Sequence, residues 1–374
     1  MRAPRRWSGP PGPTRMPALM TSDAVPETAA RPAPAPSSDK ILAIQALRAY
    51  AALGVTLFHI SVNLGVHWGV AWPQFTLGAA GVDLFFAISG FVMVHSAAPL
   101  FAQGSGPRIF MRRRLARIVP LYWAATLLMA LAVPVYSLRE AAYSFLFVPF
   151  VKRSGELGPI HPLGWTLNYE MLFYVIFAAT MVWPLRRAVP AATAVLVGLV
   201  AFGALVRPEA PALRFWTDPI VLEFAFGMWI AVAYRAGLRL PRVTANGLVA
   251  AGCALALLYG PEEYPALRVL GWGLPMALVL AGATLRQPAE GALTRLFARL
   301  GDASYSLYLL HFVLLLAWSR LWVLAGWDAA AAPVLYAASI LAIATAASLV
   351  TFRWFELPVT RTLATGRRGR SRPA

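Results

Sequence analysis

The chain has 374 residues, of which 59% are hydrophobic and 13% are charged. Soluble domains carry roughly 25% charged residues, so this composition excludes a surface that meets only water. The formal net charge of +17 comes from arginines that lie mostly in short connections between apolar runs. That pattern is typical of membrane topology rather than of nucleic-acid binding. The single cysteine, Cys253, excludes a disulfide framework.

Residues 1–39 are rich in proline, arginine, alanine and serine, and they lack the apolar core of a signal peptide. We expect them to form a disordered, basic cytoplasmic tail. Apolar runs are spread evenly over residues 40–358, which are therefore expected to form one transmembrane domain. Residues 359–374 are expected to form a second basic cytoplasmic tail.

Ten apolar stretches follow the first tail, each near the roughly 20 residues that a helix needs to cross a bilayer. The pattern predicts an all-α fold, a polytopic membrane bundle of about ten transmembrane helices. The apolar segment 141–151 is too short to span and is predicted to be re-entrant or interfacial. The ten stretches lie at about 41–62, 77–98, 117–135, 165–184, 189–206, 218–235, 244–260, 267–285, 303–325 and 333–355.

The distribution of positive charge predicts the orientation of this bundle. With the N-terminus in the cytoplasm, 26 of the 33 lysines and arginines fall on the cytoplasmic side, and the first outer loop carries none. Cytoplasmic loops of membrane proteins carry such an excess, so we expect the N- and C-termini to be cytoplasmic. The seven outer ones are Arg139, Lys152, Arg153, Arg207, Arg214, Arg268 and Arg320.

The first apolar stretch contains two ionisable side chains, which cost roughly 2.5–3.5 kcal/mol each at the centre of a membrane helix. Arg48 and His59 are eleven residues apart, which places them on one helix face, about 16 Å apart along the axis. Arg48 lies near the inner boundary, where snorkelling is the alternative to a functional role. His59 lies near the outer end, where a helix–helix hydrogen bond is the alternative to catalysis.

Three carboxylates lie at a similar depth to His59. Asp83, Glu170 and Glu223 are each five or six residues inside the outer end of their stretch, or about 8–9 Å by helix rise. Local pairing of each acid is the alternative to a shared site. A carboxylate beside a histidine fixes its tautomer and stabilises the imidazolium, which makes a general base suited to a sugar hydroxyl. We therefore predict that His59 meets these acids.

On the cytoplasmic side, four arginines lie within six residues: Arg112, Arg113, Arg114 and Arg117. Such a cluster can hold a polyphosphate through bidentate contacts, although a positive-inside anchor has the same composition. The sequence contains no P-loop, no G-x-S-x-G nucleophile motif and no metal-ligand spacing among its five histidines. We therefore predict no metal, and the sequence does not indicate a covalent serine mechanism.

These residues resemble the acyltransferase-3 family of membrane proteins, which acylate O-antigens, exopolysaccharides and nodulation factors. Six blocks match in order from about residue 41 to 358, and their order is more specific than any one of them. They are Leu47-Arg48-Ala49 with His59; Gly81 to Phe91, GVDLFFAISGF; Arg114, Arg117, Ile118, Pro120 and Tyr122; Trp165 to Tyr174, WTLNYEMLFY; Ser304 to His311, SYSLYLLH; and Phe355-Glu356-Leu357-Pro358.

The resemblance implies an acyl-CoA donor, often acetyl-CoA, and a hydroxyl acceptor on a saccharide or lipid-linked saccharide. It implies that His59 and Arg48 are essential and that Arg114 and Arg117 matter for the donor. It also implies a multi-pass protein of the bacterial inner membrane, with exopolysaccharide and lipopolysaccharide O-acetyltransferases as relatives. The sequence shows no extracytoplasmic hydrolase-like domain, which some relatives carry, so acceptor recognition is left to short outer loops.

In the mechanism that we predict, acyl-CoA phosphates dock on Arg112 to Arg117, and His59, oriented by Asp83 or Glu170, deprotonates the acceptor. Donor and base then lie near opposite faces, so the acyl arm must reach through the bundle or a relay must carry the group. His311 is a candidate relay, with a structural hydrogen bond to Tyr308 as the alternative. The remaining candidates for substrate or oxyanion contacts are Ser89, Trp165, Asn168, Tyr174 and Glu223.

A proton-coupled transporter or flippase is the alternative function, because buried acids and histidines serve carriers as well. Carriers often show inverted repeats with broken helices in matching halves, and this sequence shows none. A purely structural scaffold would tolerate the loss of both Arg48 and His59.

Overall fold

The computed structural model describes residues 1, 9, 41–133, 136–259, 267–287 and 291–365. The predicted tail at 1–39 lies outside these residues except for residues 1 and 9, and the predicted tail at 359–374 is described only as far as residue 365. Within the described ranges the ordered segments are helices, and β-pairing is limited to the isolated bridges Val151–Leu157 and Leu240–Arg286. The all-α prediction is therefore confirmed.

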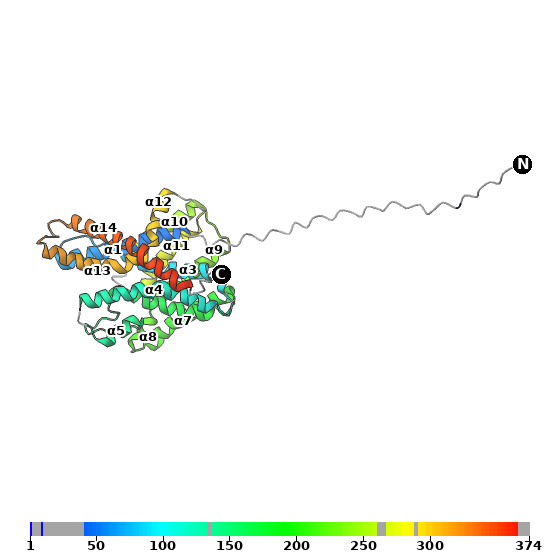
Figure 1. The fold of residues 1–374 in the computed structure, drawn as a ribbon, viewed down its shortest axis with the longest axis horizontal. Helices are drawn as coiled ribbons and strands as arrows, with labels where there is room; N and C mark the ends of the chain where they lie inside the picture. The colour runs from blue at the N-terminus through cyan, green and yellow to red at the C-terminus, as the bar shows by residue number, and fades with distance from the viewer. Residues whose placement is uncertain (2–8, 10–40, 134–135, 260–266, 288–290, 366–374) are drawn as a thin grey trace. The chain divides into compact units, whose positions relative to one another are not determined.

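The helices follow one another along the chain with short connections (Figure 1). The α-helices are α1 Leu42–Trp68, α2 Thr76–Ala79, α3 Gly81–Ala97, α4 Gly106–Ala132, α5 Leu138–Phe145, α6 Trp165–Thr180, α7 Leu185–Val206, α8 Pro211–Trp216, α9 Leu222–Arg235, α10 Arg242–Leu258, α11 Leu274–Leu285, α12 Ala292–Asp302, α13 Ser304–Leu324, α14 Pro333–Thr351 and α15 Leu357–Thr365. Short 3₁₀ turns are η1 Ala98–Leu100, η2 Pro162–Gly164 and η3 Pro219–Val221, and π-helical turns are η5 Val269–Gly273 and η6 Phe352–Glu356.

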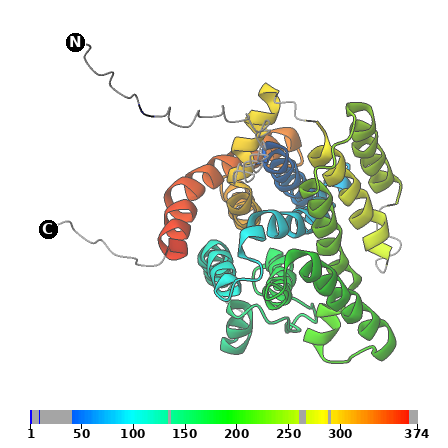
Figure 2. The ribbon, with the colours of Figure 1, turned by 90° about the vertical axis from the view of Figure 1, so that its right-hand side faces the viewer.

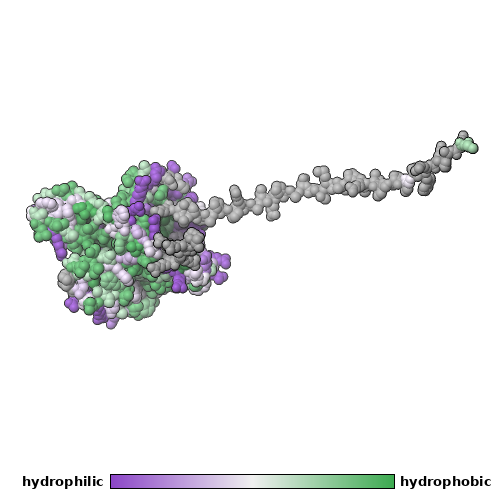
Figure 3. All heavy atoms as spheres, in the orientation of Figure 1, coloured by the Kyte–Doolittle hydropathy of each residue, from purple (hydrophilic) through white to green (hydrophobic). Residues whose placement is uncertain are grey.

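Six helical runs in the described residues are long and apolar enough to cross a bilayer. Each of the ten predicted stretches coincides with a helix, but α6 and α9 have 16 and 14 residues, and α10 has 17. Hydrophobic residues cover much of the visible face of the helical part (Figure 3). A multi-pass membrane protein follows from these apolar helices. The six long runs are Leu42–Trp68, Thr76–Leu100, Gly106–Ala132, Leu185–Val206, Ser304–Leu324 and Pro333–Ala364.

Two segments add detail to the predicted map. The segment 141–151, predicted to be re-entrant or interfacial, begins inside the short helix α5. The N-cap of this helix, Ser137, forms a capping box in which Ser137 and Glu140 each bond the other's backbone N–H. The hydrogen bonds from Ser137 hold the pKa of Glu140 below its ordinary value. At the other end, the predicted domain boundary at 358 falls inside one helical run, because α14, η6 and α15 continue to Thr365.

The helix α3 is the most buried of the long apolar runs, with 72% of its window inside the protein. In Figure 2 the N-terminal helices, blue to cyan, occupy the middle of the bundle. Gly90 of α3 lies against the backbone of Phe224 on α9, and Gly227 of α9 lies against the backbone of Ala87 on α3, with no room for a Cβ atom at either glycine. These two close approaches fix α3 against α9.

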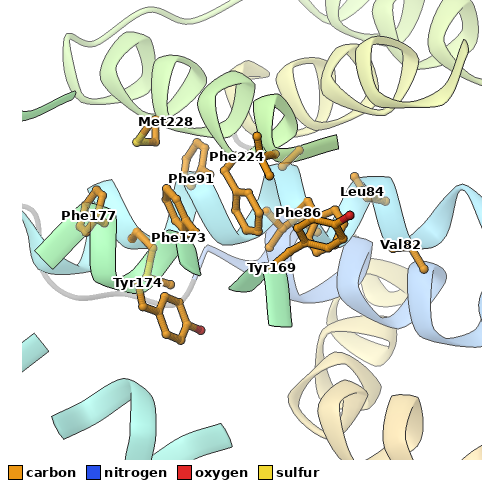
Figure 4. Close-up of a cluster of buried hydrophobic side chains, with 14 of the residues drawn as sticks. Val82, Leu84, Phe86, Phe91, Tyr169, Phe173, Tyr174, Phe177, Phe224 and Met228 are labelled. Atoms are coloured by element: carbon orange, nitrogen blue, oxygen red, sulfur yellow. The ribbon is translucent and has the colours of Figure 1, made fainter. Parts of the chain in front are cut away.

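Aromatic side chains fill the space between α3, α6 and α9 (Figure 4). Phe173 of α6 stacks on Phe224 of α9 with ring centroids 4.3 Å apart, and Phe86 of α3 lies 4.9 Å from Phe224. In Figure 4 Tyr174 turns away from this cluster, to the other side of α6. The packed aromatic layer therefore holds α6 against α3 and α9.

Candidate active site

A cavity of about 760 Å³, its open mouth included, lies between α1, α3, α4, α6 and α13. Among the residues that line it are three arginines and one carboxylate, so its charged side chains favour an anionic ligand. The polar lining residues are Arg48, Arg114, Arg117, Glu170, Ser89, Thr166, Tyr174, Ser304, Tyr305 and Tyr308.

The arginines enter the cavity on the side of the bundle where α1 begins, which we call the Leu42 side; the opposite side is the Trp68 side. Arg114 and Arg117 are three residues apart and therefore share one face of α4. Arg114 donates to Ser96 Oγ of α3 at 2.8 Å. Arg112 and Arg113 are exposed and do not line the cavity, so the predicted cluster of four divides into two pairs.

Glu356 in the π-turn η6 is a carboxylate that the sequence analysis did not assign to the site. Its side chain is 4% exposed and accepts a hydrogen bond of 2.6 Å from Ser306 Oγ. It also acts electrostatically on both Arg48 and Arg117. The signal for it was its place in the last matched sequence block, but nothing in the sequence indicates that the π-turn brings it back to α1 and α4.

Glu170 lies between two hydroxyl groups. Its Oε1 accepts hydrogen bonds from Ser89 Oγ at 3.0 Å and from Tyr174 Oη at 2.5 Å. Glu170 and Tyr174 are four residues apart on α6, so they lie on the same helix face. The structure therefore brings three of the predicted candidates together inside the cavity, although not with His59.

His59 meets a second histidine instead of a carboxylate. Its Nδ1 lies 2.9 Å from the carbonyl of Val55 and 3.3 Å from Nε2 of His311. The other ring nitrogen of His311, Nδ1, lies 2.9 Å from the carbonyl of Leu307. Among the described residues, these are the polar contacts of the His59 ring, so the predicted orientation of His59 by Asp83 or Glu170 is wrong in this structure.

The carbonyl partners assign the tautomers of this histidine pair. A carbonyl oxygen only accepts, so Nδ1 of His311 carries a hydrogen and its Nε2 is an acceptor. Nδ1 of His59 then carries a hydrogen that is shared between Val55 and His311. In the neutral pair, the lone pair of His59 is therefore on Nε2, which is the nitrogen able to act as a base.

The pair lies next to the cavity without lining it. The ring of His311 lies 6.2 Å from that of Tyr308, and Tyr308 is a lining residue whose hydroxyl contacts Thr166 at 3.0 Å. The predicted link between His311 and Tyr308 is thus a ring contact, and the hydrogen bond of His311 goes to Leu307. One aromatic ring separates the histidine pair from the arginine-lined cavity.

Asp83 belongs to a third polar group, on the Trp68 side of the bundle. Both of its oxygens accept from Arg268, Nε to Oδ1 at 2.9 Å and Nη2 to Oδ2 at 2.8 Å. The guanidinium lies 5.7 Å from the ring of Trp165 and 5.1 Å from that of Trp272. Arg268, which was placed only in the outer charge count, is therefore the partner that takes Asp83 away from His59.

Glu223 stands beside this ion pair. It is 0% exposed, it interacts electrostatically with Asp83 and Arg268, and neither of its oxygens has a hydrogen-bond partner within 3.5 Å among the described residues. Asn168 is buried as well, and its amide atoms also have no partner there. Trp165, Asn168 and Glu223 thus lie outside the cavity lining, whereas Ser89 and Tyr174 belong to it.

No group of three or more histidine, cysteine, aspartate or glutamate side chains suited to a metal ion occurs within the described ranges. The described groups in and beside the cavity are therefore hydroxyls, carboxylates, imidazoles and guanidiniums. Such a set can bind an anionic donor, accept a proton and stabilise an oxyanion, as group transfer requires.

Comparison with known proteins identifies the chain. Residues 41–353 match the acyltransferase-3 model, described as an acyltransferase domain. The chain is 37% identical over 265 residues to the exopolysaccharide production protein ExoZ of Rhizobium meliloti (strain 1021), covering 68% of this chain and 80% of ExoZ. It is 28% identical to the acyltransferase MdmB of Streptomyces mycarofaciens, covering 89% of this chain and 94% of MdmB. No solved structure matches significantly.

A further relative is the putative peptidoglycan O-acetyltransferase YrhL of Bacillus subtilis (strain 168), 25% identical, with 72% of this chain and 48% of YrhL covered. The apolar helices and the matched family define a multi-pass membrane enzyme of group transfer. The chain belongs to the acyltransferase-3 family, as its sequence blocks predicted. It is therefore a transferase of acyl groups other than aminoacyl groups, and a carrier without chemistry is set aside.

Proposed function

We propose that the protein moves an acyl group, acetyl in the simplest case, from acyl-CoA to a hydroxyl of an exported or cell-surface saccharide. The observation that carries this proposal is the cavity whose lining combines Arg48, Arg114 and Arg117 with a single carboxylate, Glu170. Guanidiniums hold phosphates through paired hydrogen bonds, and the CoA part of the donor carries several phosphates. A saccharide acceptor is supported by the names of two relatives, which refer to exopolysaccharide for ExoZ and to peptidoglycan for YrhL.

For the topology, we propose ten membrane passages, with both termini and the Leu42 side in the cytoplasm of a bacterial inner membrane. The excess of arginine in the loops of that side supports it. The domain limits that we propose are 40–358 for the membrane domain, with basic tails before and after it. Reporter fusions after Leu100, Ala132 and Arg235 test this topology: cytoplasmic reporters are expected to be active at Leu100 and Arg235, and an exported reporter at Ala132. The reverse result would overturn the proposed orientation.

For the donor, Arg117→Met is expected to raise the KM for acetyl-CoA about 10- to 100-fold, since charge-assisted hydrogen bonds contribute about 1.5–3 kcal/mol. Arg112→Met is the matched control, because Arg112 lies five residues earlier on the same helix but is exposed. Its KM should stay within about twofold of the wild type, as for other surface changes. Equal effects of the two variants would show that the cavity does not bind the donor.

For the acceptor, His59 is the proposed base. Its Nε2 takes the proton of the acceptor hydroxyl, and the resulting alkoxide attacks the acyl carbonyl. Approach of a saccharide from the Trp68 side fits the position of His59 in the half of α1 nearer Trp68. Exopolysaccharide and lipopolysaccharide hydroxyls are both suited to this chemistry.

Purified protein in lipid nanodiscs with labelled acetyl-CoA and a polysaccharide acceptor tests the function. Release of free CoA together with label in the polysaccharide is the expected result. Movement of acetyl-CoA or saccharide across the membrane with no CoA released would support a carrier instead. The acceptor itself is identified by mass spectrometry of surface glycans from cells with and without the gene, in which loss of one acyl mass is expected.

A further inference from the structure

Ser89 occupies a position in the cavity that the proposed function does not use. Ser89 is 9% exposed, and its hydroxyl donates to Glu170 Oε1 at 3.0 Å. It lines the same cavity as Arg48, Arg114 and Arg117. A serine activated as a nucleophile needs a base within hydrogen-bond reach and a third group that orients this base. Glu170 is within that reach, and Tyr174 donates to the same carboxylate oxygen at 2.5 Å.

The surrounding helices hold this arrangement rigidly. Gly90, the next residue after Ser89, packs against the backbone of α9 with no space for a side chain. On α6, the Phe173 ring is stacked against Phe224, which holds this helix against α9, and Tyr174 and Glu170 of the same helix line the cavity. A nucleophile and its base that are both held by packed helices meet the requirement for a preorganised site.

The two halves of the proposed reaction leave a gap that Ser89 can bridge. The arginines of the donor site line the cavity, but His59 does not, since Tyr308 and His311 lie between. By helix rise, Ser89 lies about 12 Å from the start of α3, and His59 lies about 13 Å from the end of α1. Both of these helix ends are on the Trp68 side, so Ser89 is at the depth of His59 while it faces the donor cavity.

We infer that Ser89 carries the acyl group as an ester between donor and acceptor. This inference rests on the proposed function, because acyl-CoA is the donor. Ser89 Oγ attacks the thioester carbonyl, its proton passes to Glu170, and the carbon–sulfur bond breaks. CoA leaves as the thiolate, which takes the proton from Glu170 as a thiol, so that the carboxylate is restored. The guanidiniums in the cavity wall offset the negative charge of the tetrahedral intermediate.

The second half of the reaction reverses the roles. The acceptor hydroxyl loses its proton to His59 Nε2 and attacks the ester carbonyl. The bond to Ser89 Oγ breaks, and the serine oxygen takes up the proton that His59 has accepted, by way of water or Glu170. The acyl-CoA donor and the saccharide acceptor then never need to occupy the cavity at the same time. The acyl arm of CoA therefore does not have to reach from the arginines to His59.

Wild-type protein in nanodiscs with acetyl-CoA and no acceptor is expected to release about one equivalent of CoA in a burst, which is the kinetic sign of an acyl-enzyme. Intact-protein and peptide mass spectrometry should then find one acetyl group on the peptide that contains Ser89. Ser89→Ala should lose the burst and the adduct, and its turnover with acceptor should fall by roughly 10³-fold or more. Ser89→Cys retains a nucleophile and should form a hydroxylamine-sensitive thioester.

Ser348→Ala is the matched control, since Ser348 is a buried membrane-helix serine whose hydroxyl, among the described residues, bonds only Thr345 O of its own helix. It should keep the burst and the adduct. His59→Ala should retain the adduct but fail to pass the acetyl group on. Full turnover in wild type and Ser89→Ala without any adduct would overturn the serine ester and leave the proposed function intact. Absence of CoA release with every acceptor would instead overturn the proposed function.

Discussion

Replacing Arg268 with methionine is expected to destabilise the protein by about 3–5 kcal/mol, the loss measured when one partner of a buried ion pair is removed. Asp83 is 0% exposed and bonds Arg268 through both carboxylate oxygens, and Glu223, also 0% exposed, lies beside the pair. Without the guanidinium, the buried carboxylates of Asp83 and Glu223 are left without a cation, so at least one of them must bind a proton. A large fall in the thermal unfolding midpoint of the detergent-solubilised protein measures the effect.

The same cluster predicts an asymmetry between its two partners. Asp83→Asn leaves the guanidinium close to Glu223, whose oxygens have no hydrogen-bond partner among the described residues, so a carboxylate remains for the cation to interact with. We expect this variant to lose less than half as much stability as Arg268→Met. Arg214→Met, at an exposed arginine of α8 on the same side of the bundle, is the control and should be nearly neutral. If Arg268→Met unfolds at the same temperature as Arg214→Met, the cluster contributes nothing to the fold.

The course of the helices could be predicted from the sequence because apolar run length is a local property. All ten predicted stretches coincide with helices, from α1 to α14, since a run of apolar residues needs only its own backbone hydrogen bonds in a membrane. The sequence did not predict the points where tertiary packing interrupts a helix. The π-turns η5 and η6 and the helix α12 carry no strong signal of this kind, and η6 is what turns Glu356 towards Arg48 and Arg117.

For the site, the helix that carries each candidate could be predicted, but the depth and direction of each side chain could not. Counted from the helix ends on the Trp68 side, His59 is nine residues in and Glu170 is five, whereas Asp83 is two and Glu223 is one, so these acids do not share the level of His59. Which acid meets which base depends on the rotation of neighbouring helices, and that is set by contacts such as Gly90 and Gly227 between α3 and α9. The rotation turns Asp83 to Arg268 and leaves Ser89 on the cavity side with Glu170.

Replacing His59 with alanine is expected to lower acyl transfer to the acceptor by about 10²–10⁴-fold, the range for loss of a positioned general base. In the neutral pair, Nδ1 of His59 carries a hydrogen that Val55 and His311 accept. The lone pair on Nε2 is therefore free to take the proton of the acceptor. His67→Ala is the control, because His67 lies on the same helix but is exposed. Added imidazole should restore part of the activity of His59→Ala but not of Ser89→Ala, which separates a missing base from a misfolded helix.

The histidine pair also predicts which substitution of His311 is tolerated. His311→Gln places an amide oxygen near the position of Nε2, so it can still accept the hydrogen on His59 Nδ1 and keep the working tautomer. His311→Leu removes the acceptor and should cost about 10- to 100-fold in turnover, as loss of an orienting partner does. Turnover rate with saturating acetyl-CoA is the measurement, and an unchanged KM for acetyl-CoA shows that the donor site is intact. Equal rates for His311→Gln and His311→Leu would mean that His59 holds its tautomer through Val55 alone.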